Sequence, residues 1–230
     1  MDIHKVLNLP NVIYTTSSPY NKEIEVLEHE STRKLRVNGA SQSVNWESPL
    51  CEKLFWGKTV ELLKKETPEL KKILILGLGG GTVQHLVSRA FPEVYIVSVE
   101  IDSVIVDIAK KYFDTSSIPN HQIIVNDAFR VVMEPEEFKL SKGGFEAVFV
   151  DVYVGEQYPN LGKSGGFISA VKNMVQPGGL VIFNRIYTEE YLDDVDAFIE
   201  QLGEFLENIQ TEIVAGYTNS DNILIYGRVF

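Results

Sequence analysis

The chain has 230 residues and a formal net charge of −11 at pH 7, from 32 acidic and 21 basic side chains. Such an acidic chain lacks the positive charge that binds nucleic acid or an anionic membrane surface, so we expect neither as a partner. Cys51 is the only cysteine, which excludes an intramolecular disulfide and agrees with a reducing, cytoplasmic location. We expect no signal peptide at residues 1–5 and no membrane-spanning segment, because no apolar run is long enough.

Residues 1–50 are predicted to form a small N-terminal β-hairpin region, and residues 51–230 a single larger domain. Within the first region, residues 23–28 alternate polar and apolar as a half-buried strand does, residues 34–37 form a second strand, and Asn38-Gly39 is a strong turn signal. From residue 50 to residue 65 apolar residues recur at helical spacing, and Thr67-Pro68 ends this helix.

A glycine-rich turn follows the first strand of the larger domain. Residues 73–82 read Ile-Leu-Ile-Leu-Gly-Leu-Gly-Gly-Gly-Thr, which predicts a buried strand, a turn and the start of a helix. Such a turn brings backbone N–H groups close to a ligand. Gly77, Gly79 and Gly81 follow the pattern G-x-G-x-G, whereas the dinucleotide fingerprint requires glycine where Thr82 stands. We therefore expect a nucleoside site, with NAD only a distant alternative.

Strands and helices then alternate to the end of the chain. Further strands are predicted at 94–99, 122–125, 147–150, 180–183, 211–215 and 222–226. Helices are predicted at 82–90, 102–113, 129–138, 164–175 and 188–208, with a turn at 176–179. This alternation predicts an α/β fold with a Rossmann-like, doubly wound, mostly parallel seven-stranded sheet.

Acidic residues follow three of the predicted strands. Glu100, Asp127 and Asp151 each come after an apolar run, and the carboxyl ends of parallel strands share one edge of the sheet, where ligands bind. Glu100 stands about 20 residues past the glycine turn, where a ribose diol would lie. The alternatives are a surface residue for Glu100 and a helix cap for Asp127. For Asp102 we favour the helix cap.

The order of these motifs resembles the class I S-adenosylmethionine-dependent methyltransferase fold and, more closely, the spermidine synthase family. Residues 18–26, followed by Leu-Arg-Val-Asn-Gly at 35–39 and by Gln42, are similar to that family's N-terminal hairpin, L-x-L-D-G-x-x-Q. The resemblance implies that Glu100 binds the ribose hydroxyls, that Asp127 and Ala128 lie at the adenine, and that Gln42 helps to close the nucleoside pocket. It also implies a homodimer formed through the N-terminal region.

Three departures from the family pattern concern the carboxylates that hold amines. Gly79 stands where aminopropyl-transferring members have the aspartate of G-G-G-D-G-G, and Val154 replaces the second aspartate of D-S-S-D-P after Asp151. Residues 55–57 read Phe-Trp-Gly, where the family has Tyr-His-Glu or Tyr-Gln-Glu. Because a buried ammonium group without a partner is costly, we do not expect ordinary spermidine synthesis.

The segment at 151–159 is similar to a branch of spermidine-synthase-like proteins with the pattern D-x-F/Y-x-G-x-x-x-P, often classed as methyltransferases. Asp151 is the predicted catalytic residue, because a carboxylate there can orient or deprotonate an acceptor. Tyr153, Glu156 and Tyr158 are predicted to line the acceptor pocket. For the two tyrosines, packing or a surface loop is an equal alternative.

We therefore predict a transferase that uses S-adenosylmethionine to methylate a small-molecule acceptor, which can be an amine. One alternative is an aminopropyltransferase that uses decarboxylated S-adenosylmethionine and has an altered amine site. Another is a non-catalytic nucleoside-binding or dimeric scaffold protein. We expect no metal, because the four histidines are scattered without ligand-like pairing.

Overall fold

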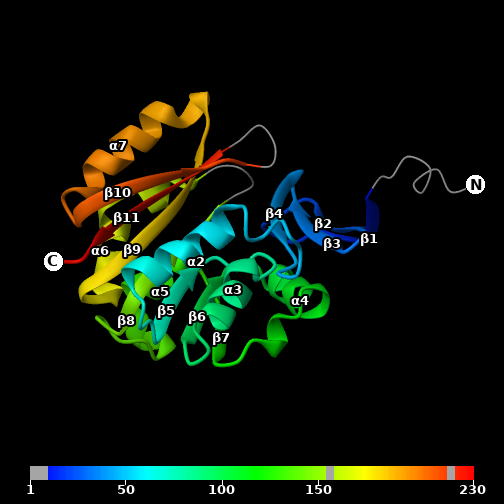
Figure 1. Cartoon of the computed structure of the whole chain (residues 1–230), viewed down its shortest axis with the longest axis horizontal. Helices are drawn as coiled ribbons and strands as arrows, with labels where there is room; N and C mark the ends of the chain where they lie inside the picture. Colours follow the sequence, from blue (N-terminus) through cyan, green and yellow to red (C-terminus); the bar gives the residue numbers. More distant parts are fainter. Residues whose placement is uncertain (1–9, 154–157, 217–220) are drawn as a thin grey trace, which may run out of the picture.

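A seven-stranded sheet forms the centre of the molecule (Figure 1) in the computed structural model, which describes residues 10–153, 158–216 and 221–230. Its order is β10-β11-β9-β8-β5-β6-β7; β5 to β9 run parallel, and β11 and β10 each run antiparallel to their neighbours. The predicted Rossmann-like, mostly parallel sheet is thereby confirmed. The strands are β5 (Lys72–Leu76), β6 (Tyr95–Glu100), β7 (His121–Val125), β8 (Phe145–Val150), β9 (Val175–Tyr187), β10 (Glu207–Val214) and β11 (Asp221–Arg228).

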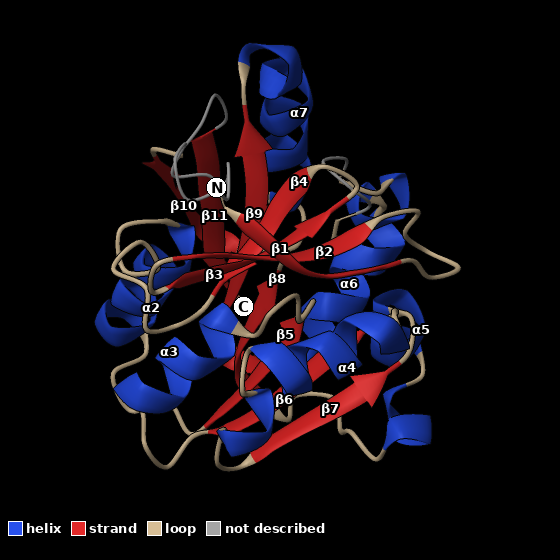
Figure 2. Ribbon diagram, turned by 90° about the vertical axis from the view of Figure 1, so that its right-hand side faces the viewer, coloured by secondary structure: helices blue, strands red, loops and turns tan. Residues whose placement is uncertain are grey.

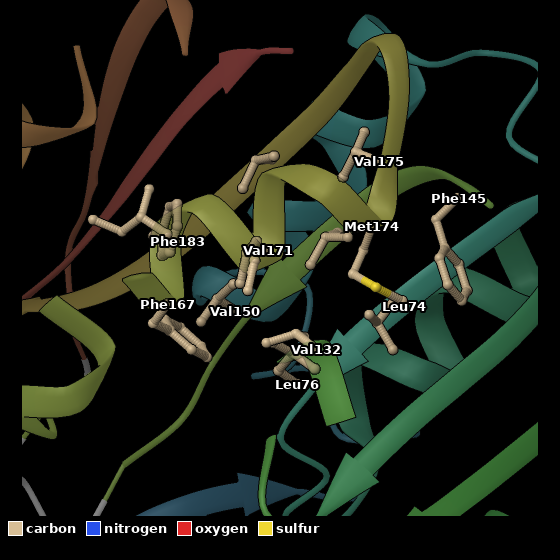
Figure 3. Close-up of a cluster of buried hydrophobic side chains, with 14 of the residues drawn as sticks. Leu74, Leu76, Val132, Phe145, Val150, Phe167, Val171, Met174, Val175 and Phe183 are labelled. Carbon is tan, nitrogen blue, oxygen red and sulfur yellow. The ribbon is translucent and has the colours of Figure 1, made fainter. Parts of the chain in front are cut away.

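Helices cover both faces of this sheet. The helices α2 (Phe55–Glu66) and α3 (Thr82–Ala90) pack on one face, and α5 (Ala128–Met133), α6 (Gly165–Met174) and α7 (Leu192–Leu202) pack on the other. In β5, Ile73 contributes to the core on the α2 side and Leu74 to the core on the α6 side, because successive strand residues point to opposite faces. Figure 3 shows Leu74 packed near Met174 of α6. Burial on both faces explains why this strand reads as a continuous apolar run.

The N-terminal region is a four-stranded antiparallel sheet, larger than the predicted hairpin. Its strands are β1 (Asn11–Thr16), β2 (Ile24–His29), β3 (Thr32–Val37) and β4 (Ala40–Val44). The predicted Asn38-Gly39 turn joins β3 to β4, and both residues have positive φ angles, 49° and 87°, as in a type I′ turn. The outer strands β1 and β4 are not predicted from the sequence. Strand β1 is an exposed edge, and β4 is rich in serine and alanine rather than β-branched residues.

The N-terminal sheet packs against α4 (Ser103–Tyr112), as Figures 1 and 2 show. Ile24, Val26 and Leu35 from the sheet form one buried cluster with Ile105 and Ile108 of α4. The sheet is therefore placed beside the carboxyl ends of the first strands, next to the glycine turn.

Two predicted helices are interrupted in the structure. The helix predicted at 129–138 divides into α5 and the 3₁₀ helix η2 (Pro135–Phe138), because proline lacks an N–H and disfavours helical conformation in the residue before it. The helix predicted at 188–208 begins as the 3₁₀ turn η4 (Glu189–Tyr191), continues as α7 and gives way to β10.

The turn predicted at 176–179 forms an irregularity inside β9 instead. Phe145 pairs with Val175, whereas Ala147 pairs with Leu180, so the intervening Gln-Pro-Gly-Gly is accommodated as a shift of register. The remaining short elements are η1 (Thr115–Ser117) and η3 (Asn160–Lys163). Within the described ranges, no helix combines the length and the apolar character needed to cross a bilayer.

Candidate functional site

A cavity of about 280 Å³ lies at the carboxyl ends of β5, β6, β7 and β8. The sheet continues to β6 and β7 on one side of β5 and to β8 and β9 on the other, which is the switch point where open α/β sheets bind ligands. The sequence-predicted site residues that line it are Gln42, Gly77, Gly79, Glu100, Asp127, Ala128, Asp151 and Tyr153.

Two other predicted site residues that the structure describes, Gly81 and Tyr158, are not part of this lining. Gly81 precedes α3 with a φ of +77°, and a side chain there would meet the methyl group of Thr115 at 2.3 Å. Tyr158 lies behind the cavity wall, next to Gly162. Glu156 lies outside the described residues, as does Val154.

The glycine turn is built for close approach of the chain at two points. Gly77 has a φ of +108°, and a Cβ there would lie 2.2 Å from the carbonyl oxygen of Asp151. Gly79 has a φ of +54°, and its Cβ would lie 2.6 Å from the hydroxyl of Ser43. Only glycine adopts these positive φ angles easily and leaves room for atoms this close. The turn therefore lets both the end of β8 and strand β4 reach the cavity.

Hydrogen bonds within the protein occupy N–H groups of this turn. Leu78 donates to Glu100 Oε2 at 3.3 Å, and Gly80 donates to Ser43 Oγ at 2.7 Å. Gly81 donates to the carbonyl oxygen of Leu78 at 2.9 Å. A phosphate site at a helix N-terminus needs such groups directed at the ligand. The geometry therefore favours a ligand without a pyrophosphate over a dinucleotide.

Glu100 is fixed at the end of β6 with its carboxylate on the cavity wall. Besides Leu78, the backbone N–H of Asp102 donates to it, at 3.0 Å to Oε1. Burial raises the pKa of Glu100, and these backbone hydrogen bonds oppose the rise. A carboxylate held in this way can accept hydrogen bonds from two ribose hydroxyls.

Asp102 caps α4, as we favoured from the sequence, by accepting the N–H of Val104 at 3.0 Å. Its other carboxylate oxygen accepts hydrogen bonds from Ser18 and from Asn21 Nδ2, the latter at 2.8 Å. Asp102 thus ties the N-terminal region to the main domain, beside the cavity that Asn21 also lines.

Both interpretations of Asp127 agree with the structure. Its Oδ1 accepts the N–H of Phe129 at 2.9 Å and caps α5, while the same residue lines the cavity beside Ala128. The cap orients the carboxylate at the carboxyl end of β7 without removing it from the site.

Asp151 lies at the end of β8 within a chain of side-chain amides. Its Oδ1 accepts a 2.8 Å hydrogen bond from Asn184 Nδ2, and Asn184 Oδ1 accepts one of 3.0 Å from Asn222 Nδ2. Burial raises the pKa of Asp151 to about 6, and the hydrogen bond from Asn184 opposes this rise. Neither asparagine is predicted from the sequence as a site residue, although Asn184 directly follows the apolar run 180–183.

The hydroxyl of Tyr153 is used by the protein itself. It donates to the carbonyl oxygen of Asn184 at 3.0 Å and accepts the N–H of Ile186 at 2.9 Å. These are backbone groups of β9 beyond the end of β8, so the phenol pairs with a strand edge that would otherwise be open. Tyr153 thus contributes its ring to the cavity wall and helps to fix the segment after Asp151.

The described lining of the cavity carries three carboxylates, those of Glu100, Asp127 and Asp151, and neither lysine nor arginine. The remainder is largely apolar and includes Ile101 and Ile105. Such a site suits a ligand with an apolar nucleoside base, a diol and a positive charge, and it opposes an anionic ligand in the same space.

The sequence of this chain is similar to those of known transferases. Residues 59–226 match the spermine/spermidine synthase domain. The chain is 28% identical over 203 residues to a polyamine aminopropyltransferase of Vibrio vulnificus, covering 84% of this chain and 66% of that protein. It is 28% identical over 130 residues to an eEF1A lysine and N-terminal methyltransferase homolog of Drosophila melanogaster, covering 53% of this chain and 19% of that protein. The chain thus spans slightly less than two thirds of the first relative and about a fifth of the second.

Solved structures share the fold at low sequence identity. A probable spermidine synthase from Corynebacterium glutamicum superposes with a TM-score of 0.77 at 18% identity, over 95% of this chain and 80% of that one. The spermidine synthase from Thermotoga maritima gives a TM-score of 0.74 at 16% identity, over 94% and 72%. These likenesses confirm the class I methyltransferase-like fold.

Proposed function

Because the chain belongs to the spermine/spermidine synthase family, we propose that it transfers an alkyl group from the sulfonium centre of an S-adenosylmethionine-derived nucleoside to a small-molecule acceptor. The observation that carries this proposal is the cavity at the switch point of the sheet, with a carboxylate at the ends of β6, β7 and β8. Carboxylates around an apolar pocket favour a cationic sulfonium nucleoside over a neutral or anionic one.

The nucleoside half of the donor fits the part of the cavity beside the glycine turn. Glu100 would accept hydrogen bonds from the ribose hydroxyls, and Asp127 with Ala128 would contact the adenine. Gln42, which β4 brings beside Gly79, would close the pocket over the nucleoside. These roles follow from the family resemblance and agree with the place of each residue in the lining.

We favour decarboxylated S-adenosylmethionine as the donor and aminopropyl transfer as the reaction. The carboxylate of S-adenosylmethionine itself would lie in a cavity whose described lining carries three acidic side chains and neither lysine nor arginine, whereas the decarboxylated donor lacks that group. The relative named a polyamine aminopropyltransferase supports the same choice. Methyl transfer, preferred from the sequence, is the second candidate and is supported by the relatives named as methyltransferases.

Asp151 is the base in this proposal. The lone pair of an acceptor amine attacks the carbon bonded to sulfur, the C–S bond breaks with its electron pair going to sulfur, and methylthioadenosine leaves. Asp151 takes the proton that the amine loses, directly or through one water. With a pKa of about 6, its carboxylate is mostly ionised at pH 7, and Asn184 holds one of its two oxygens.

Calorimetric titration with S-adenosylmethionine, decarboxylated S-adenosylmethionine, methylthioadenosine and NAD tests the proposal. We expect tightest binding among the donors for the decarboxylated form, and release of methylthioadenosine when an amine is added. Tighter binding of S-adenosylmethionine, with S-adenosylhomocysteine as product, would establish methyl transfer instead. Absence of binding to all four would favour the scaffold alternative. The homodimer and the cytoplasmic location stay predictions.

A further inference from the structure

Arg185, on β9 directly after Asn184, is buried with two donor atoms unused. Its side chain is 3% exposed, and Nη2 donates to Asp194 of α7. Among the described residues, the other two guanidinium nitrogens, Nε and Nη1, have no hydrogen-bond partner. Buried polar atoms without a partner are rare and costly, so these donors call for a ligand or a water.

The charges around Arg185 do not cancel. Lys163 Nζ donates to the same carboxylate, Asp194 Oδ1, at 2.6 Å. Among the described residues, this cluster therefore sets two cations against one carboxylate and has a formal charge of +1. This excess of positive charge among the described residues favours a singly charged anion beside Arg185.

A second unused donor lies beside the first. The guanidinium carbon of Arg185 is 4.1 Å from the ring centroid of Tyr158 and 4.8 Å from that of Phe198. The hydroxyl of Tyr158 is buried and has no hydrogen-bond partner in the part of the chain that the structure describes. Burial raises the pKa of Tyr158, so the phenol keeps its proton and can donate it.

This cluster adjoins the part of the cavity that Tyr153 and Gly162 line. A Cβ at Gly162, which lines the cavity, would lie 2.8 Å from the ring of Tyr158 and 3.1 Å from its hydroxyl oxygen. The ring of Tyr153, another lining residue, lies 5.8 Å from that of Tyr158. Arg185 shares its face of β9 with Phe183, whose core cluster also contains the cavity residue Phe167 (Figure 3).

We propose that Arg185 and Tyr158 bind a carboxylate at the far end of the acceptor, whose amine is presented to Asp151. This inference rests on the proposed transfer to an amine and names the acceptor class as an amino acid with separated amine and carboxylate groups. A carboxylate carries the single negative charge that the cluster lacks, whereas a phosphate dianion would exceed it. An ammonium group at this end, as in a diamine, would meet a positive cluster and donors in place of acceptors.

Two probes of equal chain length test whether the site prefers an acceptor that ends in a carboxylate or one that ends in an ammonium group. 4-Aminobutyrate and 1,4-diaminobutane differ only in whether the far end is a carboxylate or an ammonium. Each is titrated into the protein saturated with methylthioadenosine, and each is tested as an acceptor with decarboxylated S-adenosylmethionine. We expect 4-aminobutyrate to bind at least tenfold more tightly and to be the better acceptor.

Substitutions at Tyr158 and Asp194 test whether the preference for 4-aminobutyrate depends on the cluster around Arg185. Tyr158→Phe keeps the ring over Arg185 and removes only the hydroxyl, and should weaken 4-aminobutyrate binding about tenfold without changing binding of methylthioadenosine. Tyr226→Phe is the matched control, since the hydroxyl of Tyr226 bonds to Gln210, away from the cavity lining. Asp194→Asn removes the competing carboxylate and should strengthen 4-aminobutyrate binding several-fold.

The outcomes distinguish this inference from the proposed function. Failure of methylthioadenosine to bind would overturn the nucleoside site and, with it, the acceptor assignment. Binding of methylthioadenosine with tighter binding of 1,4-diaminobutane, or with no binding of 4-aminobutyrate, would overturn the carboxylate subsite alone. Equal affinities for 4-aminobutyrate in Tyr158→Phe and Tyr226→Phe would also overturn it. If Asp194→Asn lowers stability and leaves that affinity unchanged, Arg185 is a structural residue only.

Discussion

Asn184 Nδ2 donates a 2.8 Å hydrogen bond to Asp151 Oδ1 and thereby joins the carboxyl end of β8 to β9. The bond fixes one carboxylate oxygen and stabilises the ionised form of a group whose pKa burial raises to about 6. Tyr153 strengthens the same junction through its two hydrogen bonds to the backbone of β9. Asp151 is therefore held in one orientation by the protein itself, which the proposed role as a general base requires.

Asp151→Asn should abolish proton removal and leave the nucleoside site intact. We expect turnover to fall by about 10²- to 10⁴-fold, the usual contribution of a general base, with affinity for methylthioadenosine unchanged. Asp196→Asn, the same change at an exposed position of α7, is the control and should keep full activity. Unchanged turnover in Asp151→Asn would remove the catalytic assignment.

The pH profile of turnover should report the ionisation of Asp151. Because the base must be ionised, the rate should rise with pH through about 6 and then level off. Asn184→Ala removes the hydrogen bond that opposes the raised pKa, so its acidic limb should move to higher pH. A profile that stays in place in Asn184→Ala would contradict a positioning role for this asparagine.

Asp151→Asn should also increase stability at neutral pH. The pKa of Asp151 rises from 3.8 to about 6 on folding, so the folded protein binds this proton more tightly than the unfolded chain does. The associated stabilisation is complete below pH 3.8 and is lost as pH rises through 6. Above that pH the variant should be more stable by roughly 1–3 kcal/mol in urea unfolding, with the difference shrinking towards pH 4. An equal difference at pH 4 and pH 7 would exclude this linkage.

Glu100→Gln should weaken nucleoside binding selectively. The amide has one acceptor oxygen in place of two, and the backbone N–H groups of Leu78 and Asp102 already donate to this side chain. We expect calorimetry to show a loss of about 10- to 100-fold in affinity for methylthioadenosine, equivalent to roughly 1.5–3 kcal/mol. Glu93→Gln, at an exposed loop position, serves as control, and equal affinities in the two variants would contradict the ribose assignment.

Gly79→Ala should destabilise the protein through both backbone angle and contact. Gly79 has a φ of +54°, and the new methyl group would lie 2.6 Å from Ser43 Oγ, the atom that accepts the N–H of Gly80. We expect a loss of roughly 2–3 kcal/mol in unfolding free energy. Gly143→Ala, at a φ of +64° in open space, isolates the backbone cost and should lose only about 1 kcal/mol. Similar losses in both variants would mean that β4 does not constrain the turn.

Much of the fold could be predicted because its signals are local. Strands and their ends can be located from short stretches of sequence: the apolar run 73–76, the glycines after it, and the acids at 100, 127 and 151. The parallel arrangement then brings those ends together without knowledge of any side-chain contact. The errors arose where a local pattern is ambiguous: the run 188–208 reads as helical throughout, yet α7 ends at Leu202 and β10 begins at Glu207.

By itself, the sequence determined the order of strands and helices, the glycine turn and the acids at the strand ends, because helical and strand periodicity depend on neighbouring residues. Only the tertiary structure decided that Asn184 meets Asp151, that Tyr153 pairs with the edge of β9, and that Arg185 shares Asp194 with Lys163. These partners lie far apart in the chain or belong to different elements. Their contacts depend on strand register and on how helices pack over the sheet, which no local pattern encodes.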